Sequence, residues 1–132
     1  MTDYTTVADL SALYLEDSYV LQIVEQPGAV RFRVEAVLTP EHPAYHPPKP
    51  GEQYCYATGW LLFSAVAKVE WTRRSDAHFT DAAGEVDLGN IDYMKREAEG
   101  WALGGDWGDI VIATQTDPRF LLDDSPDGDH AP

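Results

Sequence analysis

Apolar side chains occupy every second position between Val30 and Leu38, and charged side chains fill most of the gaps. Successive residues of a β-strand point to opposite faces of a sheet, so this alternation predicts a strand with Phe32 buried and Arg33 in water. The same two-residue period recurs along the chain, whereas no helical period of comparable length does. The pattern therefore predicts a mostly β protein.

A second alternating segment covers residues 19–25, and the sequence Gln26-Pro27-Gly28-Ala29 joins it to the first. Proline presets a negative φ and glycine accepts a positive φ, which is the pairing that a type II turn requires. The two segments are therefore expected to form an antiparallel hairpin. Ahead of them, residues 7–13 fit a short helical turn with Thr6 as its N-cap.

Two long loops are expected. Five prolines lie between residues 39 and 51, and they remove backbone donors and fix φ, so neither a strand ladder nor a helix can run through this segment. Residues 73–84 are polar and rich in small side chains. Between the loops, residues 54–70 are apolar on both faces, which predicts one central strand with a bulge or bend near residues 64–67.

The remaining strands are short. Residues 91–98 fit either a strand or a helix capped by Asn90, and we favour the strand. Further strands are expected at residues 86–88, 101–103, 110–114 and 120–122. The whole pattern predicts one domain over residues 1–122, an antiparallel β-sandwich or partly open barrel of about seven strands with at most one short helix. Residues 123–132 are acidic and contain proline and glycine, so we expect a disordered tail.

Charge limits the classes of partner. The chain has 132 residues, with 23 acidic against 9 basic side chains, and a formal net charge of −14. This negative field repels nucleic acid phosphates and anionic lipid, and it accelerates encounter with a basic protein. The alternative is that the acidity only maintains solubility.

The expected location is the cytoplasm. Cys55 is the single cysteine, so no intrachain disulfide forms and a reducing compartment suits the chain. The first residues lack the basic start and apolar run of a signal peptide, and no later segment approaches the ~18 apolar residues of a membrane span.

The proline-rich loop carries candidate binding residues, namely His42, Tyr45 and His46. A His-x-x-x-His spacing presents both imidazoles on one side only when the backbone is helical, and the prolines exclude that helix. A zinc site built from both histidines and Cys55 is the alternative to solvated histidines beside a buried cysteine. We predict no metal and no cofactor.

Asp106, Trp107 and Asp109 lie on an expected glycine-rich link between two strands. An exposed Trp107 flanked by carboxylates would suit a basic partner with an apolar tip. The alternative, which packing favours, is that Trp107 folds back and plugs the end of the sandwich. Close carboxylate pairs arise by chance among 23 acids, and no nucleophile or phosphate-loop motif is present, so we assign no catalytic residue.

Two segments carry a family resemblance. Residues 13–23 lead directly into the hairpin, and residues 105–112 form an expected closing hairpin. Both resemble segments of small bacterial β-rich proteins, some of which are grouped with immunity proteins of polymorphic toxin systems. The resemblance implies a single-domain β fold and a protein-binding role without catalysis, and it transfers no functional residue. The proline-rich loop is outside the shared pattern.

We therefore expect a non-enzymatic acidic binding protein of the immunity type, which neutralises a basic protein partner and binds neither nucleic acid nor membranes. The alternative is a small metal- or ligand-binding enzyme that uses His42, His46 and Cys55. A homodimer formed through a strand edge is a further possibility.

Overall fold

The computed structural model describes residues 4–76, 78–80 and 84–123. Ten strands and one short 3-10 helix occupy this described part of the chain, which confirms the mostly β prediction. They are η1 (Tyr4–Thr6), β1 (Leu13–Gln26), β2 (Ala29–Leu38), β3 (Cys55–Phe63), β4 (Lys68–Arg74), β5 (Phe79–Thr80), β6 (Val86–Asp87), β7 (Tyr93–Glu97), β8 (Gly100–Gly105), β9 (Gly108–Ala113) and β10 (Arg119–Leu122).

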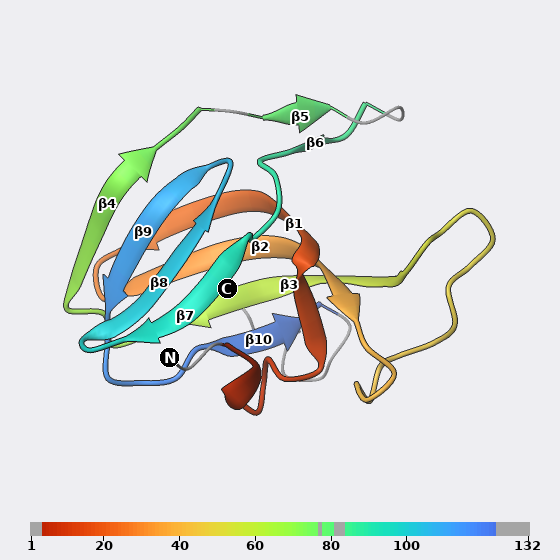
Figure 1. Cartoon of the computed structure of the whole chain (residues 1–132), viewed down its shortest axis with the longest axis horizontal. Helices are drawn as coiled ribbons and strands as arrows, with labels where there is room; N and C mark the ends of the chain where they lie inside the picture. The colour runs from red at the N-terminus through yellow and green to blue at the C-terminus, as the bar shows by residue number, and fades with distance from the viewer. Residues whose placement is uncertain (1–3, 77, 81–83, 124–132) are drawn as a thin grey trace.

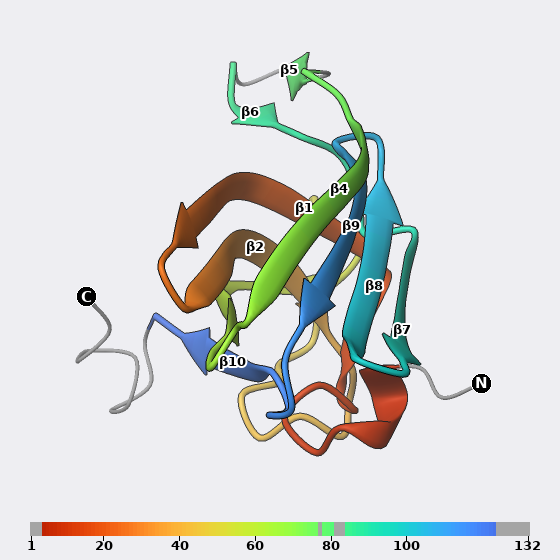
Figure 2. The same ribbon diagram turned by 90° about the vertical axis from the view of Figure 1, so that its left-hand side faces the viewer.

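The eight main strands form two antiparallel sheets of four strands each. The first sheet has the order β1-β2-β3-β10 and the second has the order β4-β9-β8-β7. The sheets lie against each other without closing into a barrel, and the short β5-β6 pair projects beyond one end (Figures 1 and 2). The architecture is therefore mostly β with two packed antiparallel sheets, which is the sandwich among the two predicted forms, a sandwich or a partly open barrel.

The β1-β2 hairpin follows the sequence pattern. Gln26 pairs with Ala29 across the turn, and Gly28 has the predicted positive φ of 77°. Along β2, Phe32 and the other alternate apolar side chains are buried, whereas Arg33 and its charged neighbours are only half-buried on the outer face.

Several boundaries differ from the predictions. The single central strand predicted over residues 54–70 is wrong, because β3 ends at Phe63 and β4 begins at Lys68 in the other sheet. The bend expected between them is a complete change of sheet, with Ala65 at a φ of 51°. Residues 7–13, predicted as a helical turn, form hydrogen-bonded turns from Leu10 to Val7 and from Leu13 to Leu10 but no helix, and η1 lies earlier. Residues 93–97 form β7, which confirms the preference for a strand.

Asp123, which the sequence places in the acidic tail, is bound to the first sheet. Its carboxylate binds the guanidinium of Arg33, with an Oδ1 to Nη1 distance of 2.6 Å. Its backbone N–H donates to the carbonyl of Thr58 over 3.0 Å. The other tail residues, 124–132, lie outside the described residues.

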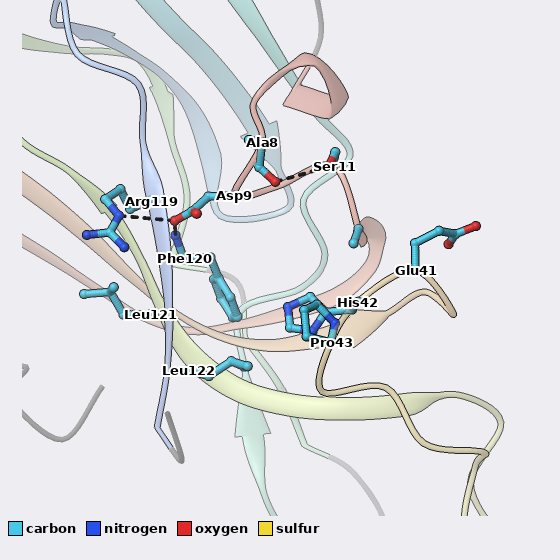
Figure 3. A pocket seen from close by; sticks show the side chains of 11 residues that line it. Ala8, Asp9, Ser11, Glu41, His42, Pro43, Arg119, Phe120, Leu121 and Leu122 are labelled. Carbon is cyan, nitrogen blue, oxygen red and sulfur yellow. Dashed lines mark hydrogen bonds and ion pairs between the residues drawn. The ribbon is translucent and has the colours of Figure 1, made fainter. Parts of the chain in front are cut away.

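Side chains and backbone from other segments cover parts of the strand edges of the first sheet. At the β10 edge, the Asp9 carboxylate accepts a hydrogen bond of 3.1 Å from the backbone N–H of Phe120 (Figure 3). At the β1 edge, the Val20 N–H donates to the Gly89 carbonyl and the Leu88 N–H donates to the Val20 carbonyl, both over 2.8 Å. Covered edges discourage pairing with other chains, and a homodimer through a strand edge stays a prediction.

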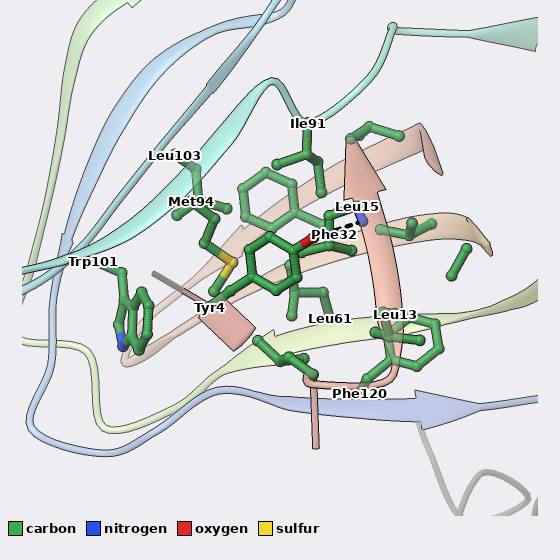
Figure 4. Close-up of a cluster of buried hydrophobic side chains, with 14 of the residues drawn as sticks. Tyr4, Leu13, Leu15, Phe32, Leu61, Ile91, Met94, Trp101, Leu103 and Phe120 are labelled. Atoms are coloured by element: carbon green, nitrogen blue, oxygen red, sulfur yellow. Dashed lines mark hydrogen bonds between the residues drawn. The ribbon is translucent and has the colours of Figure 1, made fainter. Parts of the chain in front are cut away.

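One core fills the space between the sheets. Phe32 from the first sheet and Leu103 from the second are both fully buried in it, and Tyr4 closes one end (Figure 4). The Tyr4 hydroxyl accepts a hydrogen bond from the Leu15 N–H and donates one to Glu16. The buried faces of both sheets are thus committed to packing, which leaves the outer faces and loops for function.

Candidate functional site

Four tyrosines gather on and beside the outer face of the first sheet. The strand register places Tyr14 opposite Val37, and Val37 opposite Tyr56. In the adjacent row, Tyr19 lies opposite Glu35. We use the name tyrosine face for these side chains and two neighbours, and its members are Tyr14, Asp17, Tyr19, Glu35, Tyr54 and Tyr56.

A bulge in β1 creates this grouping. Tyr14 and Tyr19 are five residues apart, so a regular strand would point them to opposite faces. The register shift between them sets both tyrosines against β2 residues that are two apart, and both therefore share the outer face. Ser18 holds the bulge: its buried hydroxyl donates to the Tyr14 carbonyl (2.8 Å) and accepts from the Val37 N–H (2.9 Å).

The tyrosine face is closely packed but open to solvent. The ring centroids of Tyr54 and Tyr56 are 6.1 Å apart with an interplanar angle of 83°, and those of Tyr19 and Tyr56 are 6.3 Å apart. Tyr14 keeps 43% of its surface exposed. The hydrogen bond to the Asp17 carboxylate is the main cause that raises the pKa of Tyr54. The Tyr54 phenol therefore stays a neutral donor to the Asp17 carboxylate at physiological pH.

Hollows adjoin the tyrosine face. The first, the apolar hollow, has a volume of about 240 Å³ and is lined by Tyr14, Leu38, Pro40, Tyr45, Pro48 and Tyr54 among others. The second, the acidic hollow, has a volume of about 460 Å³, and its lining includes Glu35, His46, Lys49, Glu52, Tyr56 and Asp123. Concave surfaces with a few polar groups are where proteins receive ligand or partner side chains.

The structure separates the residues predicted in the proline-rich loop. Tyr45 lines the apolar hollow and His46 the acidic hollow, whereas His42 lies in a third groove beside β10 together with Asp9 and Arg119 (Figure 3). Of the three, Tyr45 and His46 are therefore brought to the tyrosine face and His42 is not.

The two histidines also differ in the hydrogen bonds of their ring nitrogens. His42 Nδ1 accepts the Ala44 N–H at 3.0 Å, so its neutral ring carries the proton on Nε2. Burial lowers the pKa of His42, and the charge of Asp9 partly opposes that effect. His46 Nδ1 lies 2.9 Å from the Pro47 carbonyl, which requires the proton on Nδ1 instead.

The zinc alternative needs His42, His46 and Cys55 at one point. Cys55 is buried and lies near His46, with Sγ 3.5 Å from the His46 backbone nitrogen, but His42 lines a different groove. Within residues 4–76, 78–80 and 84–123, no three His, Cys, Asp or Glu side chains are grouped to hold a metal ion.

The prediction that Trp107 is an exposed binding residue is wrong. Only 2% of its surface is accessible, and its ring lies 5.4 Å from Phe32 and 6.1 Å from Trp71, measured between centroids. Its Nε1–H donates to the Asn90 carbonyl over 3.0 Å. Trp107 therefore plugs the space between the sheets, as the packing alternative predicts, and the adjacent Asp106 is left exposed without an aromatic anchor.

Asp109 belongs to a row of side chains across the second sheet. The Tyr93 hydroxyl donates to Oδ1 at 2.7 Å and Arg73 Nε donates to Oδ2 at 2.8 Å. Gly104 lies between Tyr93 and Asp109 in the register, and a Cβ there would lie 2.2 Å from the Tyr93 ring. The network satisfies the carboxylate internally, so Asp109 is a structural residue of β9 rather than a binding residue.

Sequence reasoning predicted none of the six residues of the tyrosine face as site residues. The alternation in β2 correctly places Glu35 on the outer face, but the bulge that brings Tyr19 beside it leaves no periodic signal. The run Glu16-Asp17-Ser18-Tyr19 contained the one available cue, a small hydroxyl residue within an otherwise regular strand pattern.

Comparison with known proteins finds no matching family model, curated protein or solved structure. Within the described residues, no helix has both the length and the apolar character needed to span a bilayer. The function is therefore inferred from the geometry and charge of this surface.

Replacing Ser18 with alanine should destabilise the fold by about 1–3 kcal/mol, because the buried Val37 N–H loses its acceptor. Urea unfolding measures the change. Ser11→Ala is the matched control, since that hydroxyl bonds an exposed carbonyl and its loss should cost less than about 0.5 kcal/mol. Equal stability of the two variants would contradict the assigned role of Ser18.

The Asp109 network predicts a pH dependence. Hydrogen bonds from Tyr93 and Arg73 lower the pKa of Asp109, so its carboxylate stabilises the fold above the ordinary value near 4, and this contribution disappears as the pH falls through the lowered pKa. Asp109→Asn should cost about 1 kcal/mol at pH 7 and progressively less below pH ~4. Unfolding series over pH, with Asp106→Asn as the charge control, check this; a cost that persists unchanged into acid would refute it.

Proposed function

We propose that this protein is a non-enzymatic binding protein that docks a basic protein partner on the tyrosine face. The grouping of four tyrosines with Asp17 and Glu35 beside two hollows is the observation that carries the proposal. Tyrosine supplies a large, stiff contact surface with a polar tip, and it is enriched in protein interfaces for that reason.

Charge favours a basic partner over an acidic or neutral one. The acidic hollow has three carboxylates among its described lining residues, from Glu35, Glu52 and Asp123, against the ammonium of Lys49 and the Arg33 guanidinium that pairs with Asp123. A smaller hollow on the other side of Tyr19 adds Glu85 and Asp87 to the lining. Together with the net charge of −14, these groups would accelerate association with a positively charged surface.

The finer part of the proposal is that the partner is a toxin, which the protein neutralises in the cytoplasm. The resemblance of residues 13–23 and 105–112 to segments of immunity proteins supports this role. The single buried cysteine, Cys55, is compatible with a reducing compartment. A metal- or ligand-binding enzyme has less support, because His42 lies in a different groove from His46 and Cys55.

Affinity capture from lysate of the encoding cells tests the proposal. The double variant Asp17→Asn/Tyr19→Ser removes one carboxylate and one aromatic ring from the tyrosine face. Its matched control, Glu70→Gln/Phe79→Ser, removes the same groups from exposed positions elsewhere. The wild type and the control should retain one basic protein, and the face variant should bind it at least tenfold more weakly.

Binding should also weaken as salt rises from 50 to 500 mM, because exposed charges are then screened over a few ångströms. After identification, the partner is purified and titrated calorimetrically against the three proteins. Equal affinity of the face variant and its control, or an affinity indifferent to salt, would refute the proposal. Loss of toxicity of the partner on co-expression would support the neutralising role, and unchanged toxicity would refute that role alone.

A further inference from the structure

We infer that the partner engages the protein through two neighbouring anchors, a large apolar side chain in the apolar hollow and an arginine or lysine in the acidic hollow. This inference rests on the proposed function, because it specifies the chemistry by which a basic protein would occupy the same surface.

The apolar hollow is shaped for one side chain. Aromatic rings of Tyr14, Tyr45 and Tyr54 and the rings of Pro40 and Pro48 line it. Its volume of about 240 Å³ equals the liquid volume of roughly eight water molecules, enough for one aromatic or branched aliphatic group. Water in such a hollow finds few hydrogen-bond partners, so an apolar side chain that displaces it gains free energy.

The acidic hollow offers acceptors. The Glu52 carboxylate accepts from the Lys49 N–H at 3.2 Å, and Arg33 orients the Asp123 carboxylate on the other side. The His46 ring also lines this hollow, and its Nδ1 lies 2.9 Å from the Pro47 carbonyl. A guanidinium carries five N–H donors and no acceptor, and therefore matches this set.

The proline-rich loop sets the two hollows side by side. Ala44 and His46 line the acidic hollow, and Tyr45 between them lines the apolar hollow. Leu38 at the end of β2 lines both. One stretch of backbone thus separates the hollows, so the residues that fill them belong to one local segment of the partner rather than to distant parts of it.

The dividing backbone is held in place before any partner binds. The Tyr45 N–H donates to the His42 carbonyl at 3.0 Å, and the His42 N–H donates to the Thr39 carbonyl at 2.9 Å. Prolines on both sides fix φ and reduce the freedom of the loop. A preformed pair of hollows loses little conformational entropy on binding, which favours recognition of a short two-anchor motif.

Short capped peptides test the inference. The probes are Ac-Arg-(Gly)n-Leu-NH2 with n from 0 to 2, and single-anchor peptides in which alanine replaces arginine or leucine. Binding to the full chain is followed by chemical-shift changes in nitrogen-15 NMR spectra. The best two-anchor peptide should bind at least tenfold more tightly than either single-anchor peptide, because linked anchors act at a high effective concentration.

Single substitutions assign each anchor. Tyr45→Ser should remove the gain from leucine and keep the gain from arginine, whereas Glu52→Gln should do the reverse. Glu41→Gln, in the same loop but lining the groove of His42, is the control and should bind like the wild type. The spectra themselves report whether each variant is folded.

Two-anchor peptides that bind no better than single-anchor peptides, or that shift residues away from the two hollows, would overturn the inference. The captured partner separates this failure from that of the proposed function. A partner that loses affinity with Asp17→Asn/Tyr19→Ser but not with Tyr45→Ser or Glu52→Gln would refute the anchors and leave the docking surface standing.

Discussion

The hydroxyl of Ser18 is the contact on which the arrangement of the first sheet depends. It takes over the hydrogen bonds that the β1 bulge withdraws from the ladder, those of the Tyr14 carbonyl and the Val37 N–H. The Ser18 carbonyl in turn accepts a hydrogen bond of 2.8 Å from the side-chain amide of Asn90, and the Asn90 backbone carbonyl accepts one from the Trp107 indole. Through these hydrogen bonds, buried Ser18 connects the tyrosine face with Asn90 and, through Asn90, with Trp107 in the core.

The outer faces of the two sheets have different roles for a physical reason. On the second sheet, Tyr93 and Arg73 both donate hydrogen bonds to the Asp109 carboxylate across the strands. On the first sheet, the tyrosine rings pack against one another and lie near carboxylates beside open hollows. Polar groups at a concave, partly hydrated surface can exchange water for partner groups at little cost.

Much of the fold was predictable because burial follows the two-residue period, as Phe32 and Arg33 show. The sandwich packing of Trp107 was foreseen as an alternative, since its size favours the interior. The predictions failed where the pairing register of the strands decides which side chains meet. The sequence predicts a bend near residues 64–67, but no local signal tells that the chain changes sheet there, or that a bulge sets Tyr19 beside Glu35. Their common place in the proline-rich loop likewise grouped His42 with His46 as candidate binding residues, whereas the loop directs them into separate grooves.

Charge and aromatic contact address different steps of binding. Carboxylates such as Glu35 and Glu52 act over distance, so they would raise the rate at which the proposed basic partner arrives. They add little to the lifetime of the complex, because exposed ion pairs are weak and screened by salt. Tyrosine rings and the apolar hollow act only in contact, and they slow dissociation by burying apolar area. Under the proposed function both steps matter, and the tyrosine face with its two adjoining hollows provides carboxylates and aromatic rings side by side.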